Sequence, residues 1–260
     1  MGRATKKAVE ETICLFDDLP EDRRPKSRVE RVEAPIWTEN KARLIAAYLR
    51  LFTYVTHHGA YIDGFAAPQS RDHTESDAAD DACAAKLVLH NRPLLLRNFW
   101  LCDKDRAGLK RLEEIKAASP EMRGRVIEIV KGDFNKTVDK ILESGVITDQ
   151  MATFCLLDQR TFECHWATVE KLARHKQNGR KIELFYFLGT SWLDRAFGGT
   201  KHKEKIARWW GRDDWEFLRA LGGPARADAF ANRFAEDLGY GHVASWPIHK
   251  RGMQGGNVMY

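Results

Sequence analysis

The sequence predicts an α/β fold: a doubly wound, mostly parallel sheet with helices on both faces and a helical insertion near the C-terminus. Two observations support this prediction. Five apolar runs follow one another along the chain, separated by stretches in which apolar residues recur at helical spacing. The runs are almost continuously apolar, which is typical of parallel strands buried on both faces. They cover residues 60–62, 99–102, 126–130, 154–157 and 182–188.

The elements around these strands are predicted from proline, charge and helical spacing. Residues 1–35 are polar and contain three prolines, so we expect an irregular charged arm. The first helix is expected to begin near Thr38, a suitable N-cap, and to continue through Phe52. Further helices are expected over 82–89, through 109–115 and through 169–172.

The sequence changes character after residue 190. We predict a tryptophan-rich helix over 203–221 and a second helix over 225–238, within a helical segment of about 200–238. A late strand is expected over 243–248. The residues from 257 onward are typical of the beginning of another strand, so we expect a truncated chain or a strand completed by another segment.

Composition excludes several classes of protein. No apolar run approaches the ~20 residues that a membrane-spanning helix needs, and charges occupy the region where a signal peptide is apolar. The five cysteines are scattered without a C-x-x-C pair, so no metal site is predicted. We therefore expect a soluble, cytoplasmic protein. The net charge of +5 is compatible with a nucleic-acid partner but does not indicate one.

An acidic residue follows each of the first four predicted strands. Ligands of open α/β sheets bind beyond the carboxyl ends of the strands, where the strand order reverses. We therefore expect these carboxylates to converge on one ligand-binding crevice. The four residues are Asp63, Asp103, Asp133 and Asp158.

Four short motifs occur in order along the chain. They are W-x-x-x-K at 37–41, Y-I-D-G-F-A-A-P-Q at 61–69, C-L-L-D-Q-R-T-F-E at 155–163 and E-L-F-Y-F-L-G at 183–189. Together they resemble the three-Cys-motif partner (TcmP) family, which is similar to class I S-adenosylmethionine-dependent methyltransferases. The resemblance covers about residues 36–260 and implies a Rossmann-like methyltransferase domain there. It also implies a radical-enzyme-like partner protein with three cysteines and a role in phage defence.

The resemblance implies that the turn after the first strand lies against the methionine part of the cofactor. It assigns Asp63, Phe65, Ala67 and Gln69 to this contact. Methyltransferase turns of this kind carry glycine at the positions of Ala67 and Gln69, because the backbone must approach the cofactor closely. The side chains at 67 and 69 are expected to occupy space that the cofactor uses. Either the Gln69 amide belongs to a modified site, or methyl-donor binding is lost.

The resemblance also implies roles for the acids that follow the next three strands. Asp103 is expected to accept hydrogen bonds from the ribose hydroxyls of S-adenosylmethionine. Asp133 and Phe134 are expected to contact the adenine. Asp158 is expected to face the transferred methyl group and the substrate.

The run after the fourth strand departs from amino-methyltransferases, whose D-P-P-Y motif holds a flipped base. The candidate catalytic residues here are Asp158, Arg160 and Glu163. Arg160 can clamp a phosphate or carboxylate through two hydrogen bonds. Asp158 or Glu163 can act as a base if burial raises its pKa. Alternatively, Glu163 caps the helix that follows.

Basic residues interleave with tryptophans in the segment after residue 200. Lys203, Lys205 and Arg208 are candidate nucleic-acid-binding residues, because cations beside aromatic rings suit phosphates and stacked bases. The alternative is an amphipathic helix with its tryptophans inward and its lysines outward.

Three functions follow from these residues. The first is a methyltransferase-like enzyme that acts on nucleic acid or a nucleotide, with a partner protein, in phage defence or DNA processing. The second is a member of the same fold that has lost the methyl donor and serves as a nucleic-acid-binding or scaffold protein. The third is a metal-dependent nuclease that uses Asp63, Asp133 and Asp158.

Overall fold

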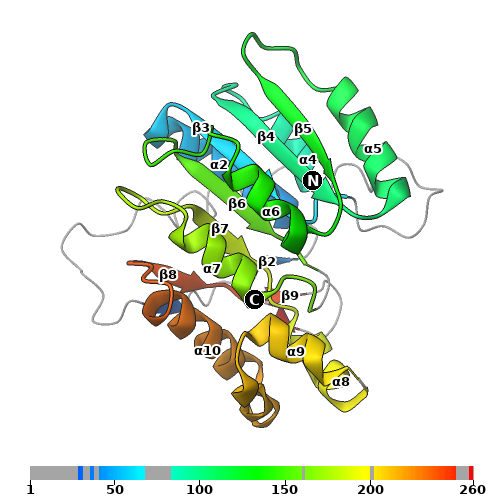
Figure 1. The fold of residues 1–260 in the computed structure, drawn as a ribbon, viewed down its shortest axis with the longest axis vertical. Coiled ribbons are helices and arrows are strands. Elements are labelled where there is room, and N and C mark those ends of the chain that lie inside the picture. Colours follow the sequence, from blue (N-terminus) through cyan, green and yellow to red (C-terminus); the bar gives the residue numbers. More distant parts are fainter. Residues whose placement is uncertain are drawn as a thin grey trace, which may run out of the picture.

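The computed structural model of this chain describes residues 29–31, 36–37, 41–67, 83–159, 162–199, 202–249 and 258–259. Five strands form a parallel sheet at its centre, in the order β5-β4-β3-β6-β7 (Figure 1). This arrangement confirms the predicted α/β fold with a mostly parallel sheet. The strands are β3 (Gly59–Asp63), β4 (Leu96–Asp103), β5 (Val126–Lys131), β6 (Thr153–Leu157) and β7 (Glu183–Tyr186).

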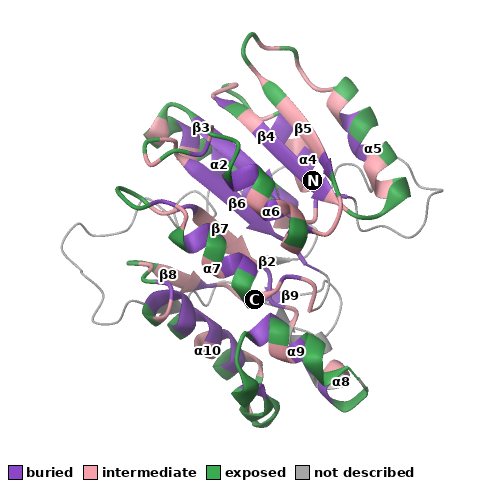
Figure 2. Ribbon diagram, in the orientation of Figure 1, coloured by how far each residue is buried: buried purple, intermediate pink, exposed green. Residues whose placement is uncertain are grey.

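Helices cover both faces of the sheet, as a doubly wound fold requires. Successive strand residues point to opposite faces. Tyr61 and Phe154 join the core formed with α2, α4 and α5, whereas Ile62 and Cys155 join the core formed with α6 and α7. Figure 2 shows that the central strands are buried between these two layers. The helices are α2 (Lys41–Thr56), α4 (Ala84–Leu89), α5 (Arg106–Ala117), α6 (Phe134–Leu142) and α7 (Trp166–Arg174).

The strand order reverses at β3, which lies between β4 and β6. From β3 the chain continues outward through β4 to β5, and it then returns to form β6 and β7 on the other side. Connections that follow β3 and β6 therefore lead away from each other. This divergence leaves an opening beyond the carboxyl ends of the two strands.

The C-terminal part is helical, as predicted, but the single helix expected over 203–221 is wrong. The structure divides this stretch at Gly211 into α9 and a 3-10 helix. Gly211 has a φ of +79°, and a Cβ there would lie 2.5 Å from the Cβ of Trp166 in α7. Close contact between α9 and α7 therefore ends the helix at a glycine. The segments are α8 (Thr190–Gly199), α9 (Lys203–Trp210), the 3-10 helix (Asp213–Ala220) and α10 (Gly223–Glu236).

Short strands from the two ends of the chain pair with each other. β8 (Val243–Ser245) pairs in parallel with β1 (Val29–Arg31), within the stretch expected to be irregular. β9 (Ile248–His249) pairs with β2 (Ile36–Trp37) and with the antiparallel β10 (Val258–Met259). The strand expected over 243–248 is thus two strands, while Thr38 and most of residues 1–35 lie outside the described residues. No helix in the described part of the chain is both long and apolar enough to cross a bilayer.

The contact between Gly211 and Trp166 can be tested with a matched pair of glycines. Gly124 has nearly the same φ, +76°, but nothing lies within 4 Å of its potential Cβ. We expect Gly124→Ala to lower the free energy of unfolding by about 1 kcal/mol, the cost of a left-handed backbone. Gly211→Ala adds overpacking and is expected to cost about 2–4 kcal/mol. Equal losses of unfolding free energy in the two variants, measured by denaturant unfolding, would contradict a close contact between Gly211 and Trp166.

Candidate functional site

A cavity of about 530 Å³ lies at the carboxyl edge of the sheet, where the strand order reverses. Three of the four predicted acids line it: Asp103 after β4, Asp133 after β5 and Asp158 after β6. The turn after β3 lines it with Gly64, Phe65 and Ala67. This volume lies within the range of about 300–1,000 Å³ that is typical of small-molecule sites. The structure therefore brings most of the predicted residues to one place.

Asp63 lies below the cavity wall instead of lining it. The strand register explains this, because Asp63 pairs with Leu101 of β4 and with Leu156 of β6. Asp103 and Asp158 each come two residues after these partners, so Asp63 is recessed by about 7 Å. It is 1% exposed, and it accepts hydrogen bonds from the Phe65 amide and from the Tyr61 hydroxyl, both at 3.1 Å. The structure thus gives Asp63 a role in holding the turn.

Burial makes ionisation of Asp63 unfavourable. It raises the pKa of this carboxyl group from 3.8 to about 7, and the negative charges of Asp158 and Asp103 act in the same direction. The hydrogen bonds from Phe65 and Tyr61 oppose the shift. Near neutral pH, Asp63 is therefore poised between its charged and neutral forms.

Asp103 fastens the turn after β3 to the end of β4. Its two carboxylate oxygens accept hydrogen bonds from the amides of Ala67 at 3.1 Å and Asp105 at 2.8 Å. The methyl group of Ala67 lies against α5, where a Cβ on Gly108 would come within 2.4 Å of it. The space needed by the extra Cβ at 67 is therefore supplied by a glycine in α5. Gln69 lies outside the described residues.

Asp133 begins α6 and is connected to the loop after β6 through Asn135. The Asp133 carboxylate accepts hydrogen bonds from the Asn135 amide at 3.0 Å and from its side-chain nitrogen at 2.8 Å. The Asn135 side chain also donates to the Glu163 carbonyl at 2.7 Å and accepts from the His165 amide at 2.8 Å. Nothing in the sequence indicated Asn135, because its partners in the loop after β6 lie about 30 residues away and leave no local signal.

Asp158 forms an ion pair with Lys41, the first residue of α2. The Lys41 ammonium lies 2.7 Å and 2.6 Å from the two carboxylate oxygens, and 4.1 Å from the centre of the Phe187 ring. The two side chains are 13% and 14% exposed. The W-x-x-x-K motif contained Lys41, but nothing in the sequence indicates a partner 117 residues away.

Glu163 does not cap α7, so that alternative is wrong. The N-cap of α7 is His165, and Glu163 instead accepts a hydrogen bond from Lys104 at 2.9 Å. This hydrogen bond raises the pKa of Lys104. Both residues line the cavity. Arg160, the third candidate catalytic residue, lies outside the described residues.

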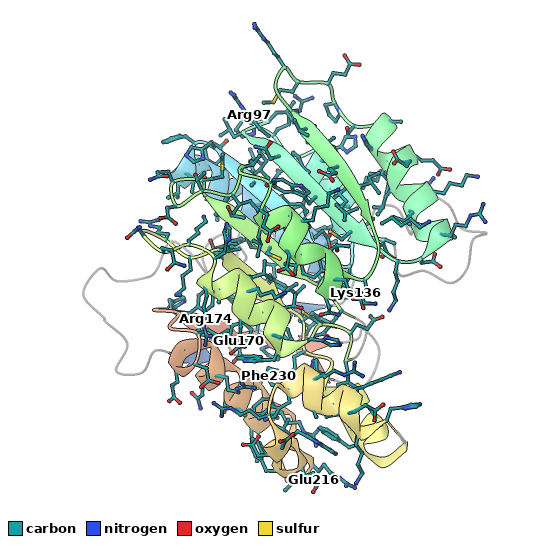
Figure 3. The ribbon with its side chains drawn as sticks, viewed as in Figure 1. Arg97, Lys136, Glu170, Arg174, Glu216 and Phe230 are labelled. Carbon is teal, nitrogen blue, oxygen red and sulfur yellow. The ribbon has the colours of Figure 1, made fainter. Side chains whose placement is uncertain are left out.

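The three predicted nucleic-acid-binding residues separate into two groups. Lys205 and Arg208 line the cavity. Lys203 instead forms an ion pair with Glu216 of the 3-10 helix, in which the Lys203 ammonium lies 3.6 Å from a carboxylate oxygen. Figure 3 shows Glu216 at the far end of the helical segment from Lys136, which also lines the cavity. Only part of the basic cluster therefore faces the site.

The tryptophans of this segment are buried in the core. Trp209, Trp210 and Trp215 are at most 6% exposed, and Trp209 packs edge-on against Phe162 with ring centres 4.8 Å apart. The alternative of an amphipathic helix with its tryptophans inward is therefore confirmed. These rings are not available to stack on bases.

The described residues contain no group of three histidine, cysteine, aspartate or glutamate side chains placed to hold a metal ion. Asp63 in particular is buried and does not line the cavity, whereas Asp133 and Asp158 do. The geometry of the described acids therefore offers no support to the nuclease interpretation.

Comparison with models of known protein families finds none that matches this chain, and no curated protein matches it significantly. The resemblance to the three-Cys-motif partner family therefore remains a prediction from short motifs.

The raised pKa of Asp63 predicts how stability depends on pH. Between about pH 4 and about pH 7 the folded chain keeps a proton that the unfolded chain has released. The free energy of unfolding should therefore fall as pH rises through this window, by about 4 kcal/mol in total. Asp63→Asn keeps a carbonyl oxygen for Phe65 and cannot ionise. Denaturant unfolding across the window should show the fall in the natural chain and a smaller one in the variant; parallel curves would refute the assignment.

The ion pair between Lys41 and Asp158 can be measured with a double-mutant cycle. Lys41→Met and Asp158→Asn, singly and together, should give a coupling energy of about 1–3 kcal/mol, because the pair is largely shielded from water. Lys171 and Asp139 are also 2.6 Å apart, but their side chains are 43% and 48% exposed. The same cycle on this control pair should give about 0.5 kcal/mol or less. A coupling no larger for the first pair than for the control would contradict a shielded ion pair.

Proposed function

We propose that this chain is a methyltransferase-like enzyme that binds S-adenosylmethionine in the cavity and acts on nucleic acid or a nucleotide. One observation carries the proposal: acids from three strands line a single cavity where the strand order reverses. This is the position at which open α/β sheets bind nucleoside-containing ligands.

Asp103 suits the ribose of such a ligand. Each of its oxygens accepts one backbone hydrogen bond, and a carboxylate oxygen has two lone pairs. Two acceptor positions therefore remain for two ribose hydroxyls. The backbone hydrogen bonds hold the carboxylate in place before the ligand arrives, which lowers the entropic cost of binding.

The turn after β3 and the beginning of α6 suit the adenosyl part. Gly64 has no side chain, and a Cβ there would come within 2.8 Å of the Phe134 ring. The backbone at Gly64 and the Phe134 ring therefore lie together in the cavity wall. The two hydrogen bonds from Asn135 reach one oxygen of Asp133, which leaves the other oxygen with acceptor capacity for an amino group.

The chain would supply binding and positioning, while S-adenosylmethionine supplies an electrophilic methyl group when bound. Asp158 and Glu163 both line the cavity, so either carboxylate can accept a hydrogen bond from the group to be modified. Arg160 is proposed to orient a phosphate or carboxylate of the substrate. The family resemblance adds the proposal of a cytoplasmic protein that acts with a three-Cys-motif partner in phage defence.

One observation favours the second candidate, a non-catalytic binding or scaffold protein. Lys41 contacts both oxygens of Asp158, so this carboxylate already has a cationic partner. In an enzyme, Lys41 would orient Asp158. In a scaffold, the ion pair would only join α2 to the sheet.

Calorimetric titration with S-adenosylhomocysteine tests the proposal. We expect binding by the natural chain and a loss of about 10-fold or more in Asp103→Asn, since hydrogen bonds to a charged group contribute about 1.5–3 kcal/mol. Asp105→Asn is the control, because Asp105 also lines the cavity but caps α5 through the Gly108 amide. This control should bind within about 3-fold of the natural chain, since asparagine also serves as an N-cap.

If S-adenosylhomocysteine does not bind to the natural chain, the proposed methyltransferase-like function is refuted. Binding that appears only after glycine is placed at both 67 and 69 would favour the non-catalytic protein, because the natural turn would then be what excludes the cofactor.

A further inference from the structure

The cavity has a basic rim that the proposed cofactor does not use. Lys205 and Arg208 are three residues apart on α9, so they share one face of the helix, and both line the cavity. His165, the N-cap of α7, lines it as well. Two separate helices thus present nitrogen-bearing side chains to the same space.

We propose that His165, Lys205 and Arg208 form a phosphate-binding subsite at the rim of the cavity, and that the substrate is a phosphate ester of a nucleoside rather than a free nucleoside or base. This inference rests on the proposed function, because it places the phosphate of the substrate beside the cofactor site.

The ion pairs formed by the neighbouring lysines support this subsite. Lys104, which also lines the cavity, is neutralised by Glu163, and Lys203 on α9 pairs with Glu216. The side chain of Lys205 forms no ion pair or hydrogen bond with any residue that the structure describes. Of the two lysines of α9, the one that lines the cavity is therefore the one whose side chain has no acidic partner among the described residues.

Arg208 retains the donors that a phosphate needs. Its Nε donates to the Glu204 carbonyl at 3.2 Å, which orients the guanidinium along α9. The two terminal nitrogens remain, and the planar group can bind two phosphate oxygens at once. Arg208 and Lys205 are both exposed, so their attraction to a phosphate should be strongly screened by salt.

The pKa of His165 reflects its burial and the nearby charge of Arg208. Burial lowers the pKa of His165, and the nearby charge of Arg208 lowers it further, while Asp133 opposes the shift. The lowered pKa favours the neutral imidazole, which can donate one N–H hydrogen bond to a phosphate oxygen beside the charge of Arg208. The rim therefore favours a phosphate, whereas the acids after the strands favour the hydroxyl and amino groups of a nucleoside.

The experiment compares ligands with and without phosphates. A short single-stranded DNA is tested against a peptide nucleic acid of the same sequence, which has the bases but no phosphates. We expect DNA to bind at least about 10-fold more tightly at low salt, and its affinity to fall steeply as salt is raised. Competition by nucleoside monophosphates distinguishes a nucleotide substrate from a strand. Equal binding of the two polymers, or failure of both DNA and nucleoside monophosphates to bind, would overturn the subsite.

Single substitutions on α9 locate the contact. Lys205→Ala and Arg208→Ala should each weaken DNA binding by about 10-fold and reduce the slope against salt concentration by about one. Lys203→Ala is the matched control, because it removes the same charge from the same helix but from the side paired with Glu216. It should bind DNA within about 2-fold of the natural chain. An equal loss in all three variants would indicate general attraction to a basic surface and would overturn the subsite.

The same proteins are titrated with S-adenosylhomocysteine to separate the two proposals. Unchanged cofactor binding in the α9 variants is expected, because these residues are assigned to the substrate. If the cofactor binds but phosphate ligands do not, the subsite is wrong and the proposed function stands. If phosphate ligands bind through Lys205 and Arg208 but S-adenosylhomocysteine does not bind, the phosphate-binding subsite stands. The proposed methyltransferase function is then wrong.

Discussion

The placement of β3 between β4 and β6 is the constraint on which the site depends. Because the chain continues from β3 to one side of the sheet and from β6 to the other, the described elements leave an opening at the carboxyl edge between them. The cavity forms at this opening, and its acids come from strands that are neighbours in space. A different strand order would place Asp103 and Asp158 on separate parts of the molecule.

The acids around the cavity hold the scaffold together as well as lining the cavity. Asp103 joins the turn after β3 to β4, Asp133 caps α6, and Asp158 joins β6 to α2 through Lys41. These contacts order the carboxylates in advance, which favours a site that binds without large rearrangement. Asp63 lies under the same cluster, and its resistance to ionisation follows from burial first and from these neighbouring negative charges second.

The helical segment after the sheet contributes the opposite charge. Ile206, Trp209 and Trp210 anchor α9 in the core, while the close approach of Gly211 to Trp166 fixes the end of this helix against α7. These contacts hold the other face of α9, with Arg208, toward the cavity. In the proposed function, the tryptophans would therefore act indirectly, by positioning a cation rather than by touching a ligand.

The sequence by itself determined the parallel sheet, its helices and the acids after four strands, because apolar runs and helical spacing reflect burial within short segments. Only the tertiary structure decided which of these acids reach the cavity. The register recesses Asp63, Gly108 accommodates the methyl group of Ala67, and Lys41 meets Asp158 across 117 residues. The break at Gly211 likewise depends on Trp166 in another helix. Each of these outcomes arises from packing between distant segments, and local patterns do not contain that information.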